Sequence, residues 1–384
     1  THPTHSLPLG EQTDTMGLLD KIKDLEAEIA RTQKNKATEK HLGSLRAKLA
    51  KARAEMMEGP KSSGKGEGFD VAKAGDARVS MVGFPSVGKS TLLSKVTDTE
   101  STSGAYEFTT LTCIPGVIEY MGANIQLLDL PGIIEGAAKG KGRGRQVIGV
   151  ARTSDLILMM MDASKGEIQR KLLEAELESV GIRLNEQPPD ITFKVKKGGG
   201  IQFNSTVPLT KIDENVVKSI LSTYKIHHAE VLFREDATMQ QFIDVIQGNR
   251  RYIRCLYVYN KMDTVWMEEV ERLANQPDTI VISCAWDINL DWLIESIWDY
   301  LDLTRVYTKK RSAMPDFDEP FILRDGTDVE SVCRSIHNDM VNTFKYATVW
   351  GRSSKFNPNP QRVGLKHVLA DEDVLQIVAA TIDG

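Results

Sequence analysis

The stretch GFPSVGKSTL, residues 83–92, decides the fold of this chain. Its spacing of Gly, four residues and Gly-Lys-Ser follows a β-rich run, residues 78–84, and leads into a helical run, TLLSKV. A glycine loop between a strand and a helix lets backbone N–H groups reach phosphate oxygens, and the helix N-terminus adds the positive end of its dipole. The stretch therefore predicts a phosphate-binding loop.

Three side chains of this loop have expected roles. Lys89 is expected to reach the β- and γ-phosphates, the Ser90 hydroxyl to bind Mg²⁺, and Thr91 to help hold the α-phosphate. The remaining loop residues are expected to line the nucleotide: Gly83, Phe84, Pro85, Ser86, Val87 and Gly88. The loop predicts a nucleoside triphosphate site with Mg²⁺ as its cofactor.

Two further segments are expected to sense the γ-phosphate. Asp129 of the motif DLPG follows an apolar strand and is expected to meet Mg²⁺ through water, while the Gly132 N–H meets the γ-phosphate. In YEFTTLT, residues 106–112, Thr110 is expected to close over Mg²⁺ and the γ-phosphate, with Thr109 as the alternative. We expect Lys89, Ser90, Thr110 and Gly132 to take part in hydrolysis.

A third motif, Asn260-Lys261-Met262-Asp263, indicates which base is bound. The Asp263 carboxylate is expected to accept hydrogen bonds from guanine N1–H and the 2-amino group, which adenine does not offer. Asn260 is expected to tie this segment to the phosphate loop, and the stem of Lys261 to cover the base. Ser283-Cys284-Ala285 is expected to contact guanine O6 by a backbone N–H. These motifs favour GTP over ATP.

The bulk composition excludes several functional classes. A net charge of −5 gives no global attraction for DNA or an anionic membrane. The four cysteines lie far apart in the sequence, which argues against a zinc or disulfide framework. The longest strongly apolar run, residues 156–161, is too short to span a bilayer. The scattered cysteines fit a reducing compartment, and no membrane partner is expected.

The order of apolar runs predicts the architecture. Strand candidates alternate with helical stretches, which is typical of a doubly wound, mostly parallel α/β sheet, and we place this domain at 76–302. The stretch at about 168–235 is too long for one crossover and predicts an inserted α+β subdomain. Residues 16–58 predict a helical hairpin, and residues 303–384 predict a compact α+β module.

These motifs together resemble those of the Obg-like GTPases. The resemblance narrows to the developmentally regulated GTP-binding protein (DRG) family through further segments: TQKNKAT (32–38), KGRGRQV (141–147), PDFDEP (315–320), KYATVWG (345–351) and NPQRVGLKH (359–367). It implies a P-loop GTPase domain with an inserted subdomain, an N-terminal hairpin and a C-terminal TGS module of β-grasp fold. It also implies a cytoplasmic switch that works on translating ribosomes with a DRG family regulatory protein. The alternative is an assembly platform whose docking surfaces matter more than turnover.

The position after the DLPG glycine raises a question about hydrolysis. Many small GTPases keep a water-positioning Gln there, but this chain has Ile133. We expect slow turnover that a partner stimulates. Potassium as a second cofactor is an alternative, although related potassium-using GTPases often carry Asn where this chain has Ser86. Arg143 and Arg145 are further candidates to stabilise the transition state.

Several surfaces leave two interpretations open. The basic outer face of the hairpin is either solvated or contacts RNA. In the C-terminal module, Lys345, Trp350, Arg352 and Arg362 either form an RNA or protein contact or are solvated. Trp286, Trp292 and Trp298 are expected to pack in the core, with a partner surface as the alternative. The Cys284 thiol is a minor candidate for a reactive group.

Overall fold

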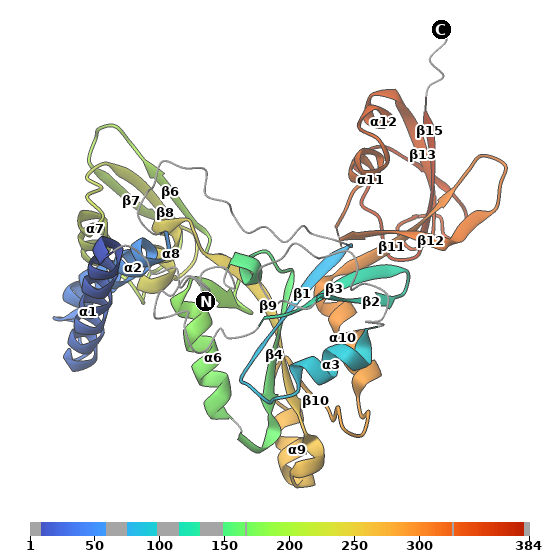
Figure 1. Cartoon of the computed structure of the whole chain (residues 1–384). Coiled ribbons are helices and arrows are strands. Elements are labelled where there is room, and N and C mark those ends of the chain that lie inside the picture. The colour runs from blue at the N-terminus through green and yellow to red at the C-terminus, as the bar shows by residue number, and fades with distance from the viewer. Residues whose placement is uncertain are drawn as a thin grey trace. The chain divides into compact units, whose positions relative to one another are not determined.

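The structure, a computed structural model, describes residues 9–58, 75–97, 115–130, 149–165, 167–324 and 326–379 (Figure 1). These residues form two compact units. The first unit contains residues 9–58, 149–152 and 168–254, and the second contains the described residues of 75–130, 153–167 and 255–379. Within the described ranges, no helix has the length and apolar character needed to cross a membrane.

A central sheet carries the phosphate loop. Its strands are β1 (Ala77–Gly83), β2 (Pro115–Tyr120), β3 (Ala123–Asp129), β4 (Leu156–Asp162), β9 (Arg251–Asn260) and β10 (Thr279–Val281). They lie in the order β10-β9-β4-β1-β3-β2. The pairs β1–β3, β1–β4 and β9–β10 are parallel, and β2 is antiparallel to β3. The expected mostly parallel α/β sheet is therefore confirmed.

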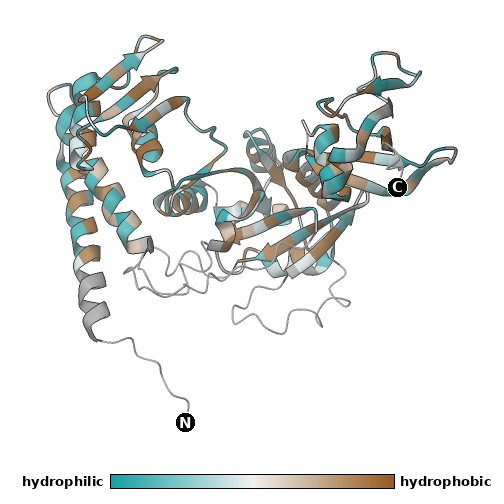
Figure 2. Cartoon of the chain, turned by 90° about the horizontal axis from the view of Figure 1, so that it is seen from above, coloured by the Kyte–Doolittle hydropathy of each residue, from teal (hydrophilic) through white to brown (hydrophobic). Residues whose placement is uncertain are grey.

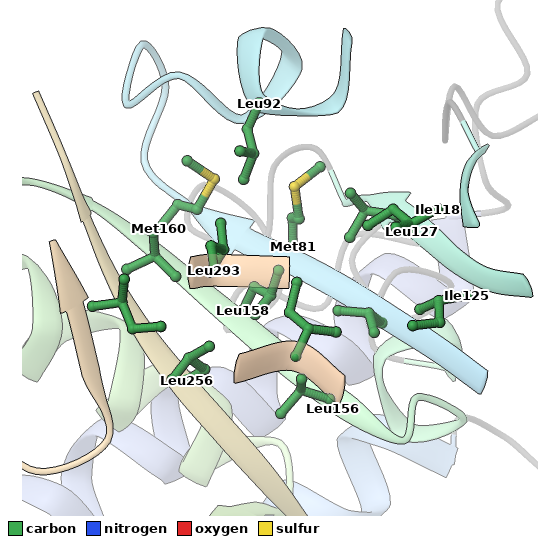
Figure 3. Close-up of a cluster of buried hydrophobic side chains, with 14 of the residues drawn as sticks. Met81, Leu92, Ile118, Ile125, Leu127, Leu156, Leu158, Met160, Leu256 and Leu293 are labelled. Atoms are coloured by element: carbon green, nitrogen blue, oxygen red, sulfur yellow. The ribbon is translucent and has the colours of Figure 1, made fainter. Parts of the chain in front are cut away.

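The core of this sheet explains its stability. Every residue of β1 and β4 is buried, as expected for strands covered on both faces. Helices α3 (Lys89–Val96) and α10 (Leu290–Leu301) contribute Leu92 and Leu293 to the same cluster as Met81 and Leu158 (Figure 3). Burying such side chains contributes about 1.5–3 kcal/mol each, so the strand ends that carry polar residues are anchored firmly.

The tryptophan expectation is wrong for two of the three residues. Trp298 packs in the core at 7% exposure, but Trp286 and Trp292 are 67% and 59% exposed. The reason is the orientation of α10, which buries Leu293 and Ile297, four residues apart, and thereby turns Trp292 outward. Trp286 lies in the loop before this helix.

The C-terminal module has its own sheet and core. Its elements are β11 (Leu303–Lys309), β12 (Pro315–Arg324), α11 (Val329–Ile336), α12 (Asn338–Thr343), β13 (Phe344–Trp350), β14 (Gln361–Val363) and β15 (Asp373–Ala379). The strand order is β12-β11-β15-β13-β14, with β11 and β15 parallel. Val332 of α11 packs with Val349 and Leu375 of the sheet. On this module the Arg362 guanidinium lies 4.6 Å from the Tyr346 ring centroid, and Arg352 pairs with Glu372.

The first unit joins the hairpin to the inserted subdomain. Its elements are α1 (Leu9–Arg31), α2 (Glu39–Glu58), α6 (Glu167–Ser179), β5 (Ile182–Leu184), β6 (Ile191–Val195), β7 (Ile201–Ser205), α7 (Glu214–Thr223), β8 (Ala229–Phe233) and α8 (Met239–Gln247). Figure 2 shows apolar and hydrophilic residues alternating along the hairpin helices. Ala47 and Ala50 of α2 pack into the same core as Val217.

Two boundaries differ from the expected ones. Helix α1 begins at Leu9, seven residues before Met16. The inserted subdomain extends past residue 235, because Phe242 and Ile243 of α8 are buried in its core. Strand β5 pairs with residues 251–253 of β9, so the insertion joins the central sheet through that strand.

Candidate nucleotide-binding site

The phosphate loop joins the end of β1 to the start of α3 (Figure 1). Gly88 has a φ of 100°, and an added Cβ would stand 2.3 Å from Asn260 Nδ2. Only glycine therefore fits this position. Gly88 is the residue that precedes α3, and it places no side chain on the helix N-terminus. The first N–H groups of α3 are the donors that a phosphate would meet.

Lys89 lies folded over this loop. Its Nζ donates hydrogen bonds to the carbonyl oxygens of Gly83 at 3.0 Å and Phe84 at 3.1 Å. Burial lowers the pKa of the Lys89 amine, while the Asp129 carboxylate acts in the opposite direction and raises it. A phosphate beside the amine would favour the charged form as well. The geometry places one cation where the phosphates are expected.

The expected magnesium ligands lie side by side. The Ser90 hydroxyl donates to Asp129 Oδ2 at 3.1 Å, which brings the phosphate loop to the end of β3. Asp129 is 8% exposed, and its other oxygen, Oδ1, is buried and receives no hydrogen bond from any described residue. A hydroxyl beside a carboxylate with a free oxygen fits Mg²⁺, which takes few protein oxygens and completes its shell with phosphates and water.

Asn260 connects the phosphate loop to the two base loops. Its Nδ2 donates to the Val87 carbonyl at 2.8 Å. Its Oδ1 accepts from the backbone N–H groups of Lys261 at 2.8 Å and Cys284 at 3.0 Å. The side chain is 3% exposed, so these hydrogen bonds are shielded from water. Three segments that are far apart in the sequence therefore share one amide.

The base loops are also joined to each other. The Ser283 hydroxyl donates to Asp263 Oδ1 at 2.5 Å, and the Trp286 N–H donates to Ser283 Oγ at 3.2 Å. One Asp263 oxygen is thus held by the protein. This arrangement orients the carboxylate that is expected to read guanine.

Asp162 is a residue that the sequence interpretation missed. It ends β4, and its Oδ2 accepts from Lys261 Nζ at 2.8 Å. Burial opposes its charge, but hydrogen bonds from Lys261 and Ser164 outweigh burial and lower the Asp162 pKa. The ion pair holds the Lys261 side chain against the end of β4. An aspartate as the last residue of a fully buried strand was the available signal.

The Cys284 side chain has no sign of a reactive thiol. Burial raises its pKa to about 11, which keeps it protonated at neutral pH. Cys284 contributes to the site through its backbone N–H, which donates a hydrogen bond to Asn260 Oδ1. The next residue, Ala285, is exposed at the end of this loop.

The remaining site predictions fall outside the described residues. They are Thr109, Thr110, Gly132, Ile133, Arg143 and Arg145. The described site therefore consists of the phosphate loop, Asp129 and the two base loops. All of these parts follow strands of the central sheet, where ligands of α/β folds are expected.

Three family models match consecutive parts of the chain. Residues 78–195 match the model described as 50S ribosome-binding GTPase, and residues 198–303 match the C-terminal region of the MMR_HSR1 domain. Residues 304–379 match the TGS domain. The fold and the site thus define a P-loop GTPase domain that is followed by a TGS domain.

Full-length relatives specify the family. Developmentally-regulated GTP-binding protein 2 of Bos taurus is 66% identical over 364 residues, covering 94% of this chain and 100% of that protein. Its homolog from Dictyostelium discoideum is 62% identical over the same coverage. A solved GTP-binding protein from Pyrococcus horikoshii OT3 has a TM-score of 0.42 at 15% identity, covering 79% of this chain and 100% of that chain. This chain belongs to the developmentally-regulated GTP-binding protein family.

We expect Asn260→Ala to weaken guanine nucleotide binding at least about tenfold, because three buried hydrogen bonds are lost. The measurement is calorimetric titration of the full chain with GDP and Mg²⁺. Asn275→Ala, an exposed change at the end of α9 (Met267–Ala274), is the matched control and is expected to bind like the parent. Equal affinity of the two variants would show that the Asn260 amide does not organise the site.

Proposed function

We propose that this chain binds GTP with Mg²⁺ and hydrolyses it to GDP and phosphate as a switch on translating ribosomes, together with a DRG family regulatory protein. The observation that carries the nucleotide part is the joining of the phosphate loop and both base loops by Asn260. Family membership and the match to a model of ribosome-binding GTPases support the ribosome part.

The residues of the site divide the work of phosphoryl transfer. Lys89 and the first N–H groups of α3 hold and neutralise the phosphates. Ser90, Asp129 and Thr110 are the proposed magnesium ligands, and the ion supplies charge neutralisation on the β- and γ-phosphates when it is bound. The Gly132 N–H is proposed to contact the γ-phosphate, which would make this segment sensitive to hydrolysis.

The base specificity rests on Asp263. Its carboxylate accepts from the two adjacent donors of guanine, and the Ser283 hydroxyl keeps it in place. A nucleotide whose base lacks those donors would leave the carboxylate unpaired, which costs several kcal/mol. ATP is therefore rejected at this position.

We expect Asp263→Asn to lose about a thousandfold in GTP affinity and to gain affinity for xanthosine triphosphate. The amide keeps an acceptor for N1–H but offers a donor to the xanthine 2-oxygen. Competition between GTP and xanthosine triphosphate for binding to the full chain measures the change in base preference. Asp299→Asn, an exposed change on α10, is the control. A uniform loss of both nucleotides would contradict the proposed base contact.

The control of hydrolysis is proposed to come from outside the DLPG segment. Ile133 has no hydrogen-bonding group with which to orient water, so turnover of the isolated chain is proposed to be slow. A partner or a monovalent cation is the proposed source of the missing stabilisation. Ser86 lies in the phosphate loop with a φ of 62°. Related potassium-using GTPases often carry Asn at this position, so a substitution of Ser86 tests the potassium route.

If potassium supplies this charge, turnover is expected to be faster in K⁺ than in Na⁺ at equal ionic strength. Phosphate release by the full chain is the measurement, with and without ribosomes. Ser86→Asn is expected to increase the K⁺ effect, because an amide oxygen adds a cation ligand. Equal rates in both salts for the parent and the variant would exclude the potassium route and leave the partner as the activator.

The switch and the platform functions differ in their need for nucleotide. Lys89→Ala removes the phosphate-binding cation and is expected to abolish turnover. If the chain is a switch, this variant also loses nucleotide-dependent ribosome association, measured by cosedimentation with GTP or GDP. Asp299→Asn, the exposed change on α10, is the control. Unchanged ribosome and partner binding by the Lys89 variant would favour the platform.

A further inference from the structure

Four large apolar side chains are exposed in the two segments that follow the base loops in the sequence. Trp266 and Met267 at the start of α9 are 85% and 74% exposed, and Trp286 and Trp292 are exposed by more than half. Exposed tryptophans are uncommon on the surface of a soluble domain unless they contact another molecule. We call these four residues the tryptophan surface.

The tryptophan surface is connected to the loops that are proposed to read guanine. Trp266 follows Asp263 by three residues. The Trp286 N–H donates to Ser283 Oγ, and Ser283 in turn donates to Asp263. The backbone of Met262 also bonds to Ile282 at 3.2 Å. A molecule that immobilises these tryptophans would therefore act on the base loops.

The stretch of chain that carries this surface is strongly acidic, although Lys95 of α3 pairs with Asp287 next to Trp286. Residues 262–302 contain ten acidic side chains and a single basic one, Arg272. Arg272 is already engaged by Glu269 and Glu167. Exposed carboxylates within five residues of these tryptophans in the sequence are Glu268, Glu271, Asp291 and Glu295. The net charge of the whole chain is only −5, so the negative charge is concentrated here.

This concentration of charge selects the partner. Nucleic acid and anionic lipid would be repelled. A second copy of the same surface would bring like charges together. Lysine and arginine side chains are attracted both by the carboxylates and by the faces of the indole rings. The combination of exposed tryptophans and acidic residues thus fits a basic protein segment.

We propose that the tryptophan surface and its carboxylates dock a lysine- and arginine-rich segment of a partner protein. Docking holds the loop that runs from Ser283 to Trp286, and so slows release of the guanine nucleotide. The effect on release rests on the proposed function, whereas docking itself does not. By linkage, any gain in nucleotide affinity that docking produces is matched by an equal gain in docking affinity when nucleotide is bound.

The docking test uses a fluorescein-labelled peptide of four Arg-Leu-Lys repeats and the full chain. Anisotropy is measured at about 50 and 150 mM salt. The same peptide with Gln at every basic position is expected not to bind. Trp266→Ala/Trp286→Ala is expected to bind the basic peptide roughly tenfold more weakly, since each exposed cation–π contact contributes about twofold to fivefold.

A charge variant and two controls complete this test. Asp291→Asn/Glu295→Gln is expected to weaken binding and to reduce its salt dependence. Two changes outside the residues of the tryptophan surface are expected to have no effect: Phe356→Ala, at an exposed aromatic of the C-terminal module, and Asp24→Asn/Glu55→Gln, which removes two exposed charges from the hairpin. Equal weakening by the surface variants and the controls would overturn the proposal, because it would show non-specific attraction.

The second measurement follows release of a fluorescent GDP analogue from the full chain. The basic peptide is expected to slow release severalfold from the parent and not from the tryptophan variant. Peptide binding without a change in release would overturn the connection to the base loops. If the parent does not bind the analogue at all, the proposed function fails, while the anisotropy measurements still decide whether the surface docks a basic segment.

Discussion

The site depends on the side-chain amide of Asn260. Its donor holds the phosphate loop at Val87, and its acceptor holds two backbone N–H groups of the base loops. An amide is the side chain that offers both functions in one plane, and burial makes each hydrogen bond costly to lose. The close approach of Gly88 to the same amide shows that the loop and the side chain require each other.

The central sheet makes this meeting possible. Strands β1, β3, β4 and β9 are buried along most of their length, and each one ends in a polar residue or loop of the site. Parallel pairing brings these ends to one edge. The ion pair between Lys261 and Asp162 adds a contact between the ends of β4 and β9. The hydrophobic core thus fixes polar groups that attract one another only at short range.

The two ends of the site differ in charge. The phosphate end combines Lys89 with the N-terminus of α3, whereas the chain around the base loops is strongly acidic. This separation suits a nucleotide, whose phosphates need positive charge and whose guanine needs an acceptor. It also makes the chain beside the base loops negatively charged, and this charge is the basis of the proposed docking of a basic segment.

The sequence by itself determined the phosphate loop, the carboxylate of Asp129 and the guanine motif, because each depends on backbone chemistry within a few residues. It also determined the parallel sheet through its apolar runs. Only the tertiary structure decided that Asp162 pairs with Lys261 and that Trp286 and Trp292 are exposed. Those outcomes depend on which strands become neighbours and which face of α10 meets the sheet, and both are set by packing between segments far apart in the chain.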